Sequence, residues 1–212
     1  LLVAVDSNEM TQWLGYHSCS HQRGIVLINQ DRIKEAAATI IKAIGEDSTR
    51  EGLVDTPGRI ARMYKEFFSG IGRNPAEPLD TYFEESHRGI IVLKDIQFFS
   101  ICEHHFLPFF GTVDIGYIPN GRVVGASKLA RSLDILARRP QIQERLTDQF
   151  ADTIAKSVRP DGVIVVLRAE HQCMSLRGIE KSNSRIVTSA SRGTLLSDAE
   201  AKQEFYAMLR EK

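Results

Sequence analysis

Residues 162–173 read Gly-Val-Ile-Val-Val-Leu-Arg-Ala-Glu-His-Gln-Cys. The run 163–167 is continuously aliphatic and mostly β-branched, which is typical of a strand buried on both faces. Toward the end of the segment the apolar residues give way to His171 and Cys173. Because side chains alternate along a strand with a period of two, we expect both to share a face with Ala169. The segment therefore predicts a central strand that carries two potential metal ligands at its far end.

Strands and helices are predicted on both sides of this segment. Upstream, residues 90–99 are β-rich, and in 111–118 apolar and polar or small residues alternate, so we expect these two to form an antiparallel pair. A shorter strand is predicted over 185–189. The helix that begins at Asp31 has one apolar stripe, formed by Ile33, Ala37, Ile40 and Ile44.

Capping residues mark the other helices. Thr56-Pro57 supplies an N-cap and a first-turn proline to a helix that ends at Gly70. Two further helices are predicted over 127–139 and 142–158, and a last one begins at Ser197, where Glu200 completes a capping box. The order of elements predicts an α+β domain with an antiparallel sheet, a helical pair and N-terminal helices.

Composition excludes several classes of protein. The 212 residues suffice for one domain, and 27 Lys and Arg balance 27 Asp and Glu. With no net field to hold a polyanion, we expect no nucleic-acid partner, and any anion binding must be local. No apolar run reaches the roughly 18 residues of a membrane span, so no membrane association is expected. Only three cysteines argue against a disulfide scaffold and favour a reducing compartment such as the cytoplasm.

The densest group of reactive side chains is Cys102-Glu103-His104-His105, which falls in the break between the first two strands. Cys102 and His105 form a C-x-x-H pair, and thiolate and imidazole ligands suit Zn²⁺. Together with Cys173 they would make a three-ligand site that leaves a fourth position for water, the catalytic arrangement. If His104 or His171 joined them, the site would be structural, and the residue types leave that alternative open.

Other candidate groups have simpler interpretations. The cluster His17-Ser18-Cys19-Ser20-His21 is a rival metal site, but it lies in an irregular segment with no partner pair, so we interpret it as incidental. His87 lies in a polar connection and is interpreted as a surface residue. Arg138 and Arg139 are interpreted as surface charges.

Several motifs in one order resemble GTP cyclohydrolase I, the zinc-dependent type I enzyme family that opens folate and pterin synthesis. The motifs are Cys102-Glu103-His104-His105, Gly125-Ala126-Ser127-Lys128-Leu129, Gln141-Ile142-Gln143-Glu144-Arg145-Leu146-Thr147, His171-Gln172-Cys173 and Arg177-Gly178. The resemblance covers roughly residues 31–211. One departure is Ala126, which stands where the family more often has a larger aliphatic residue, and the smaller side chain would make the pocket wall slightly wider.

The resemblance implies a reaction and its catalytic residues. Cys102, His105 and Cys173 would hold Zn²⁺, and GTP and water would give 7,8-dihydroneopterin triphosphate and formate without a redox cofactor. His171 would act as the acid at N7 of the guanine, and His104 would assist proton movements on the ribose side.

The resemblance also implies a set of substrate contacts. A carboxylate accepts hydrogen bonds only, so Glu144 can take both N1–H and the 2-amino group of guanine, with Gln143 beside it in the substrate-binding set. Ser127 would contact the ribose. The triphosphate needs several cations, and these would be Lys128, Arg131, Arg59, Arg62 and Arg177. The first four form two pairs spaced i, i+3, a spacing that surface helices also show.

The family's architecture is implied as well. The resemblance implies a tunnelling fold assembled as a homodecamer whose sites lie between subunits, and an exposed sheet edge would permit such pairing. We divide the chain into an irregular arm (1–28), a helical segment (29–88) and a catalytic domain (89–212). Whether a regulatory protein binds is left open.

Two rival functions are weighed against this one. Another enzyme of the same fold, such as a pyruvoyl-tetrahydropterin synthase-like lyase or a nitrile reductase-like protein, should have different ligands or a different nucleophile. A catalytically silent, zinc-stabilised paralogue or regulatory scaffold would have no use for His104 and His171 as extra proton donors.

Overall fold

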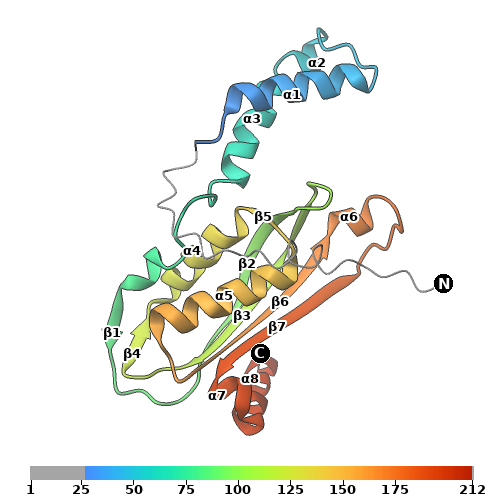
Figure 1. Ribbon diagram of the computed structural model, residues 1–212. Helices are drawn as coiled ribbons and strands as arrows, with labels where there is room; N and C mark the ends of the chain where they lie inside the picture. Colours follow the sequence, from blue (N-terminus) through green and yellow to red (C-terminus); the bar gives the residue numbers. More distant parts are fainter. Residues whose placement is uncertain (1–26, 212) are drawn as a thin grey trace, which may run out of the picture.

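The computed structural model describes residues 27–211, and its centre is a five-stranded sheet in the order β5-β2-β3-β6-β7 (Figure 1). The strands are β2 (Ile91–Cys102), β3 (Pro108–Ile118), β5 (Pro140–Gln141), β6 (Gly162–His171) and β7 (Arg185–Gly193). Every pairing is antiparallel except the short parallel one between β5 and β2. The predicted antiparallel pairing of the first two strands is confirmed.

β3 and β6 form the middle of the sheet, and their register places the reactive end of the molecule. Phe109 lies opposite His171, and Val113 lies opposite Leu167. β2 ends at Cys102, beside the start of β3. Cys102 and the loop that follows it therefore lie at the same end of the sheet as the last residues of β6. Two segments about 70 residues apart in sequence therefore meet at one end of the sheet.

Two helices, α4 (Ala126–Ala137) and α5 (Gln143–Val158), cover one face of the sheet (Figure 1). Their apolar residues pack against the inward side chains of β3 and β6 in the main core. Fully buried members include Leu133, Phe150, Ile154, Val113, Ile115, Val165 and Leu167. This is the α+β class predicted, with an antiparallel sheet and a helical pair.

The opposite face is covered in part by α7 (Thr194–Ser197) and α8 (Ala199–Arg210). Phe205 is fully buried there against Ile164 and Val166. Gly116 of β3 makes room for it, since a Cβ at this position would collide with the Phe205 ring. The side chain of Asp198, rather than Ser197 as predicted, caps α8 by accepting from the backbone N–H groups of Glu200 and Ala201.

The N-terminal helices project away from the sheet (Figure 1). They are α1 (Gln30–Ala43), α2 (Glu51–Val54) and α3 (Thr56–Phe67). α3 leads into Gly70, whose N–H donates to Arg138 O at the end of α4, and a Cβ on Gly70 would collide with Ile135 O. The predicted stripe of α1 is partly wrong: Ala37 and Ile41 are buried, whereas Ile40 and Ile44 are 62% and 71% exposed because α1 packs on α3 through a narrower face.

A connection between the two parts contains η1 (Glu77–Asp80) and a two-stranded sheet of β1 (Tyr82–Glu84) and β4 (Arg122–Val124). Within residues 27–211, no helix is long and apolar enough to cross a membrane.

Candidate metal centre

Cys102, His105 and Cys173 converge at one end of the sheet. Their potential ligand atoms all lie within 4.8 Å of one another. Cys102 is the last residue of β2 and is buried, His105 lies in the following loop and is exposed, and Cys173 is half-buried. The structure thus brings together the three residues that the sequence pattern singled out, with one donor facing solvent.

The loop after β2 is folded tightly by its own backbone. Cys102 N–H donates to Leu107 O at 2.9 Å, and Phe106 N–H donates to Cys102 O at the same distance. Phe106 adopts a left-handed conformation with φ of 54°. The loop is tied to β5 through Glu103 N–H and Gln141 O at 3.0 Å. These bonds place His105 beside the sulfur of Cys102 even though His105 itself is exposed.

An ion pair connects the same loop to α5. The Arg145 guanidinium makes two hydrogen bonds to the Glu103 carboxylate, at 2.5 and 3.0 Å. These bonds hold the pKa of Glu103 below its usual range, and burial opposes them. The bidentate geometry fixes the direction of the loop more strongly than a single contact does.

Cys173 is positioned differently from the prediction. β6 ends at His171, and Cys173 lies in the short helix α6 (Gln172–Ser175), so the strand alternation does not extend to it. The turn into α6 nevertheless carries its sulfur to Cys102. Burial raises the pKa of the Cys173 thiol, and the neighbouring Cys102 sulfur raises it further.

The donor set fits a soft divalent cation. Burial and the neighbouring Cys102 sulfur raise the pKa of the Cys173 thiol, and a cation bound between the two sulfurs would stabilise its thiolate form. Two sulfurs and one imidazole form a borderline-soft donor set, unlike the all-oxygen sites of Mg²⁺ or Ca²⁺. The site is therefore a candidate transition-metal centre with three protein donors.

His171 lies beside this cluster but faces other groups. Its side chain is 8% exposed and its ring stacks on Phe109, with centroids 4.6 Å apart and planes at 5°. Nε2 is 2.9 Å from Gln143 Oε1. Burial lowers the pKa of His171, and the nearby Glu144 carboxylate opposes that shift. His104 is exposed, with Nδ1 3.9 Å from Cys102 Sγ.

The predicted substrate residues fall into two groups. Near the metal cluster are Glu144, exposed in the first turn of α5, and Arg177, whose charge partly opposes the rise in the pKa of Cys173 that burial causes. Gln143 is also close, but it is 1% exposed and already bonded to His171.

The second group lies apart from the metal cluster. Lys128 and Arg131 line a cavity of about 590 Å³, together with Arg73 and Arg138 and without any of the three metal-site residues. Ser127 is exposed at the start of α4. Arg59 and Arg62 are exposed on the projecting α3, where Arg59 lies 3.5 Å from Asp55.

Some functional neighbours were not predicted. Phe109 and Arg145 touch His171 and Glu103 respectively, and only the tertiary fold brings these pairs together. Arg139, interpreted as a surface charge, is half-buried and donates to Gly70 O and Arg73 O, so that interpretation is wrong. The rival cluster at residues 17–21 lies outside the described residues.

Comparison with known proteins gives concordant matches. The sequence model of one family, described as GTP cyclohydrolase I, matches residues 33–210. A protein named GTP cyclohydrolase 1 from Halalkalibacterium halodurans is 49% identical over 184 residues, which is 86% of this chain and 98% of that protein. The protein of the same name from Dehalococcoides mccartyi strain BAV1 is 52% identical over 188 residues, 88% of this chain and 100% of that one.

One solved structure has a weaker likeness. It is the crystal structure of the archaeosine synthase QueF-Like in the apo form, with a TM-score of 0.40 and 20% identity, and the match covers 50% of this chain and 94% of that one.

Proposed function

The chain belongs to the GTP cyclohydrolase I family, and from this membership and the geometry of the site we propose that it converts GTP and water to 7,8-dihydroneopterin triphosphate and formate. The observation that carries the proposal is the cluster of Cys102, His105 and Cys173 within 4.8 Å, flanked by His171 and Glu144. A three-donor metal centre can activate water, a neighbouring histidine can transfer a proton, and an exposed carboxylate can accept hydrogen bonds from a purine.

The three donors suit Zn²⁺, which accepts sulfur and imidazole ligands in a tetrahedral site with one position open. Zinc held there would supply Lewis acidity that makes water a stronger nucleophile near neutral pH. Cys102 and Cys173 would bind it as thiolates, and the exposed His105 would complete the set on the solvent side.

The remaining residues bind the substrate and move protons. His171 would give a proton to N7 of the guanine, which makes the adjacent C8 electrophilic, and His104 would serve proton transfers near the ribose. Glu144 would accept hydrogen bonds from N1–H and the 2-amino group. Ser127 would contact the ribose, and Lys128, Arg131, Arg177, Arg59 and Arg62 would neutralise the triphosphate.

We further propose that the active protein is a homo-oligomer, a decamer by family resemblance. The supporting observation is the separation of the predicted substrate residues, because Arg59 and Arg62 project on α3 while Glu144 and Arg177 lie near the metal cluster. If a neighbouring chain completed the site, its Arg59 and Arg62 could contact the same substrate as Glu144 and Arg177. Within residues 27–211, Cys102 and Cys173 form no disulfide, which supports a reducing compartment such as the cytoplasm.

The test measures metal content and product together. The purified protein should contain close to one zinc per chain and release formate and a fluorescent pterin from GTP after oxidation. Cys173→Ser should lose both metal and turnover, because a serine oxygen is a poor replacement for a thiolate ligand. The matched control is Ser175→Ala, which changes a neighbouring residue of α6 that is not a metal donor.

The same experiment separates this function from the silent scaffold. A wild-type protein with full zinc and no turnover of GTP would support the scaffold and contradict the proposal.

A further inference from the structure

The side-chain amide of Gln143 can be oriented in only one way. Its Nε2 lies 3.0 Å from Ile186 O and 3.3 Å from Leu167 O, and both are backbone carbonyls that only accept hydrogen bonds. If the amide were turned over, its oxygen would face these two oxygens, and both the buried Leu167 carbonyl and the half-buried Ile186 carbonyl would lose a donor. Oε1 must therefore be the atom that faces His171 Nε2, at 2.9 Å.

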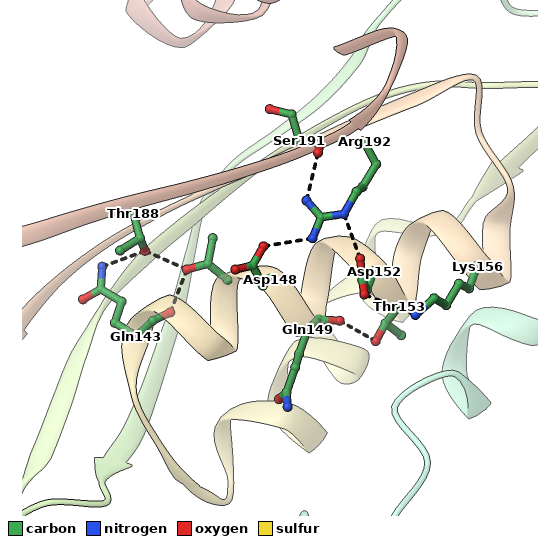
Figure 2. Close-up of polar contacts among 10 residues, drawn as sticks. Gln143, Asp148, Gln149, Asp152, Thr153, Lys156, Thr188, Ser191 and Arg192 are labelled. Atoms are coloured by element: carbon green, nitrogen blue, oxygen red, sulfur yellow. Dashed lines mark hydrogen bonds and ion pairs between the residues drawn. The ribbon is translucent and has the colours of Figure 1, made fainter. Parts of the chain in front are cut away.

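Two hydroxyl groups, of the buried Thr147 and the half-buried Thr188, reinforce this orientation. Gln143 Nε2 also lies 3.1 Å from Thr188 Oγ1 (Figure 2), and Thr188 Oγ1 lies 2.6 Å from Thr147 Oγ1. The Thr147 hydroxyl donates its single proton to Gln143 O at 2.8 Å. In the bond between the two threonines, Thr188 must therefore be the donor, and Thr188 Oγ1 accepts from Gln143 Nε2. The donor and the acceptor of every hydrogen bond that links Gln143, Thr188 and Thr147 are thus determined.

The direction of these hydrogen bonds determines which ring nitrogen of His171 carries a proton. An amide oxygen only accepts, so Nε2 of His171 must carry a proton to make the 2.9 Å bond. In the neutral ring this leaves Nδ1 without a proton. Among residues 27–211, no hydrogen-bond partner of Nδ1 is present, and the stacked Phe109 fixes the plane of the ring.

We propose that Gln143 is a positioning residue that holds His171 as the Nε2–H tautomer, so that Nδ1 is the ring nitrogen that exchanges a proton with the substrate. Thr188 and Thr147 support it by fixing the amide. This assigns Gln143 a role different from the direct substrate contact predicted from the sequence. The inference rests on the proposed function for its chemical meaning, but the tautomer itself is a property of the folded protein.

The first experiment reads the tautomer directly. The whole zinc-loaded protein, labelled with ¹⁵N in its histidine rings, is sedimented and examined by magic-angle-spinning NMR above pH 8, where a neutral ring dominates. The His171 signals are identified by their loss in His171→Gln. We expect a protonated Nε2 and a bare Nδ1. The opposite tautomer would overturn the proposal, whether or not the protein turns over GTP.

The second experiment separates positioning from substrate contact. Gln143→Met should lower kcat about 10- to 100-fold, while zinc content stays at the wild-type level and KM for GTP changes less than about threefold. Thr188→Val should lower kcat by a smaller factor in the same direction. Gln149→Met, on the half-buried side of the same helix and bonded to Gln141, is the matched control and should keep wild-type kcat.

The outcomes distinguish the hypotheses. A rise in KM with unchanged kcat in Gln143→Met would identify a substrate contact and contradict the proposal. If Gln143→Met does not fold, Thr188→Val and the NMR measurement decide. Absence of GTP turnover in the zinc-loaded wild type would refute the proposed function and leave the tautomer result standing.

Discussion

At the residue scale, removing His171 separates proton transfer from metal binding. His171→Ala should retain zinc but lower product formation about 10²- to 10⁴-fold, because the ring is bonded to Gln143 and stacked on Phe109 rather than grouped with the three metal donors. Metal analysis and single-turnover assays on the same sample measure the two effects. Loss of zinc from this variant would identify His171 as a fourth ligand and make the open-site argument wrong.

Glu144 allows a test of base recognition. Glu144→Gln replaces an acceptor of two hydrogen bonds with a group that also donates, so it should reduce the preference for GTP over inosine triphosphate, which lacks the 2-amino group, by about tenfold or more. The ratio of kcat/KM for the two nucleotides measures this preference. An unchanged ratio would reject the assigned role. Asp148→Asn, one turn along the exposed side of α5, is a suitable control.

The candidate site was predictable where chemistry is local in sequence. The C-x-x-H spacing of Cys102 and His105 places both in one loop, and their proximity to Cys173 follows from neighbouring strand ends. The geometry of Cys173 was not predictable from alternation, because the chain turns into α6 directly after His171. Contacts that join distant segments, such as Arg145 with Glu103, leave no local pattern in the sequence.

At the element scale, the strands were predictable from the sequence, whereas the N-cap of α8 and the buried face of α1 were not. The period-two pattern of residues 111–118 and the aliphatic run 163–167 predicted β3 and β6 because burial dictates both patterns. The start of α8 was displaced by one residue, since Ser197 and Asp198 are both good N-caps and only the backbone decides between them. In α1, the exposure of Ile40 depends on what packs against it, which the helix alone does not encode.

Figure 2 shows a charged connection between α5 and β7, and we expect this connection to make a pH-dependent contribution to the stability of the fold. Arg192 donates to Asp152 at 2.8 Å and to Asp148 at 2.9 Å, and Lys156 reaches Asp152 at 3.2 Å. Burial acts to raise the pKa of Asp152, but the hydrogen bonds from Arg192 and Lys156 outweigh it and lower the pKa. A carboxylate with a lowered folded-state pKa stabilises the fold above its unfolded value, and that contribution is lost as the pH falls through the folded value.

Asp152→Asn should therefore be less stable than the wild type at pH 7 by about 0.5–1 kcal/mol, a small value because the Asp152 side chain is 42% exposed and solvent screens the pair. The difference should shrink below about pH 4. Thermal unfolding at matched protein concentration across this range measures it. Asp148→Asn, which removes a single contact to Arg192, should have a smaller effect, and a gap that persists unchanged at pH 3 would contradict the electrostatic account.

At the scale of the whole molecule, the distribution of the predicted substrate residues argues for a site shared between chains. The metal donors lie at the ends of β2 and β6, whereas Arg59 lies in the first turn of α3, at the end far from the Gly70 junction with α4. α3 projects away from the sheet (Figure 1). If Arg59 contacts the same GTP as Cys173 and Glu144, the most direct arrangement takes Arg59 from a neighbouring subunit. The division into segments 1–28, 29–88 and 89–212 stays a prediction, and its helical segment would then serve assembly as well as packing.

Shared sites predict complementation between two inactive variants. Arg59→Ala should bind zinc normally but use GTP poorly, and Cys173→Ser should lack the metal, so neither is active alone. When the two are co-expressed with different tags and hetero-oligomers are isolated through both tags, random assembly should give about one quarter of the sites an intact Arg59 from one chain and an intact Cys173 from another. Activity per site should recover to about that fraction of the wild type.

The control co-expresses Cys173→Ser with His105→Ala, which affect the same metal cluster and should restore nothing beyond their separate values. Hetero-oligomers of the first pair that carry zinc in half of their chains yet show no recovered turnover would place Arg59 and Cys173 in the same chain's site, or Arg59 outside the site altogether.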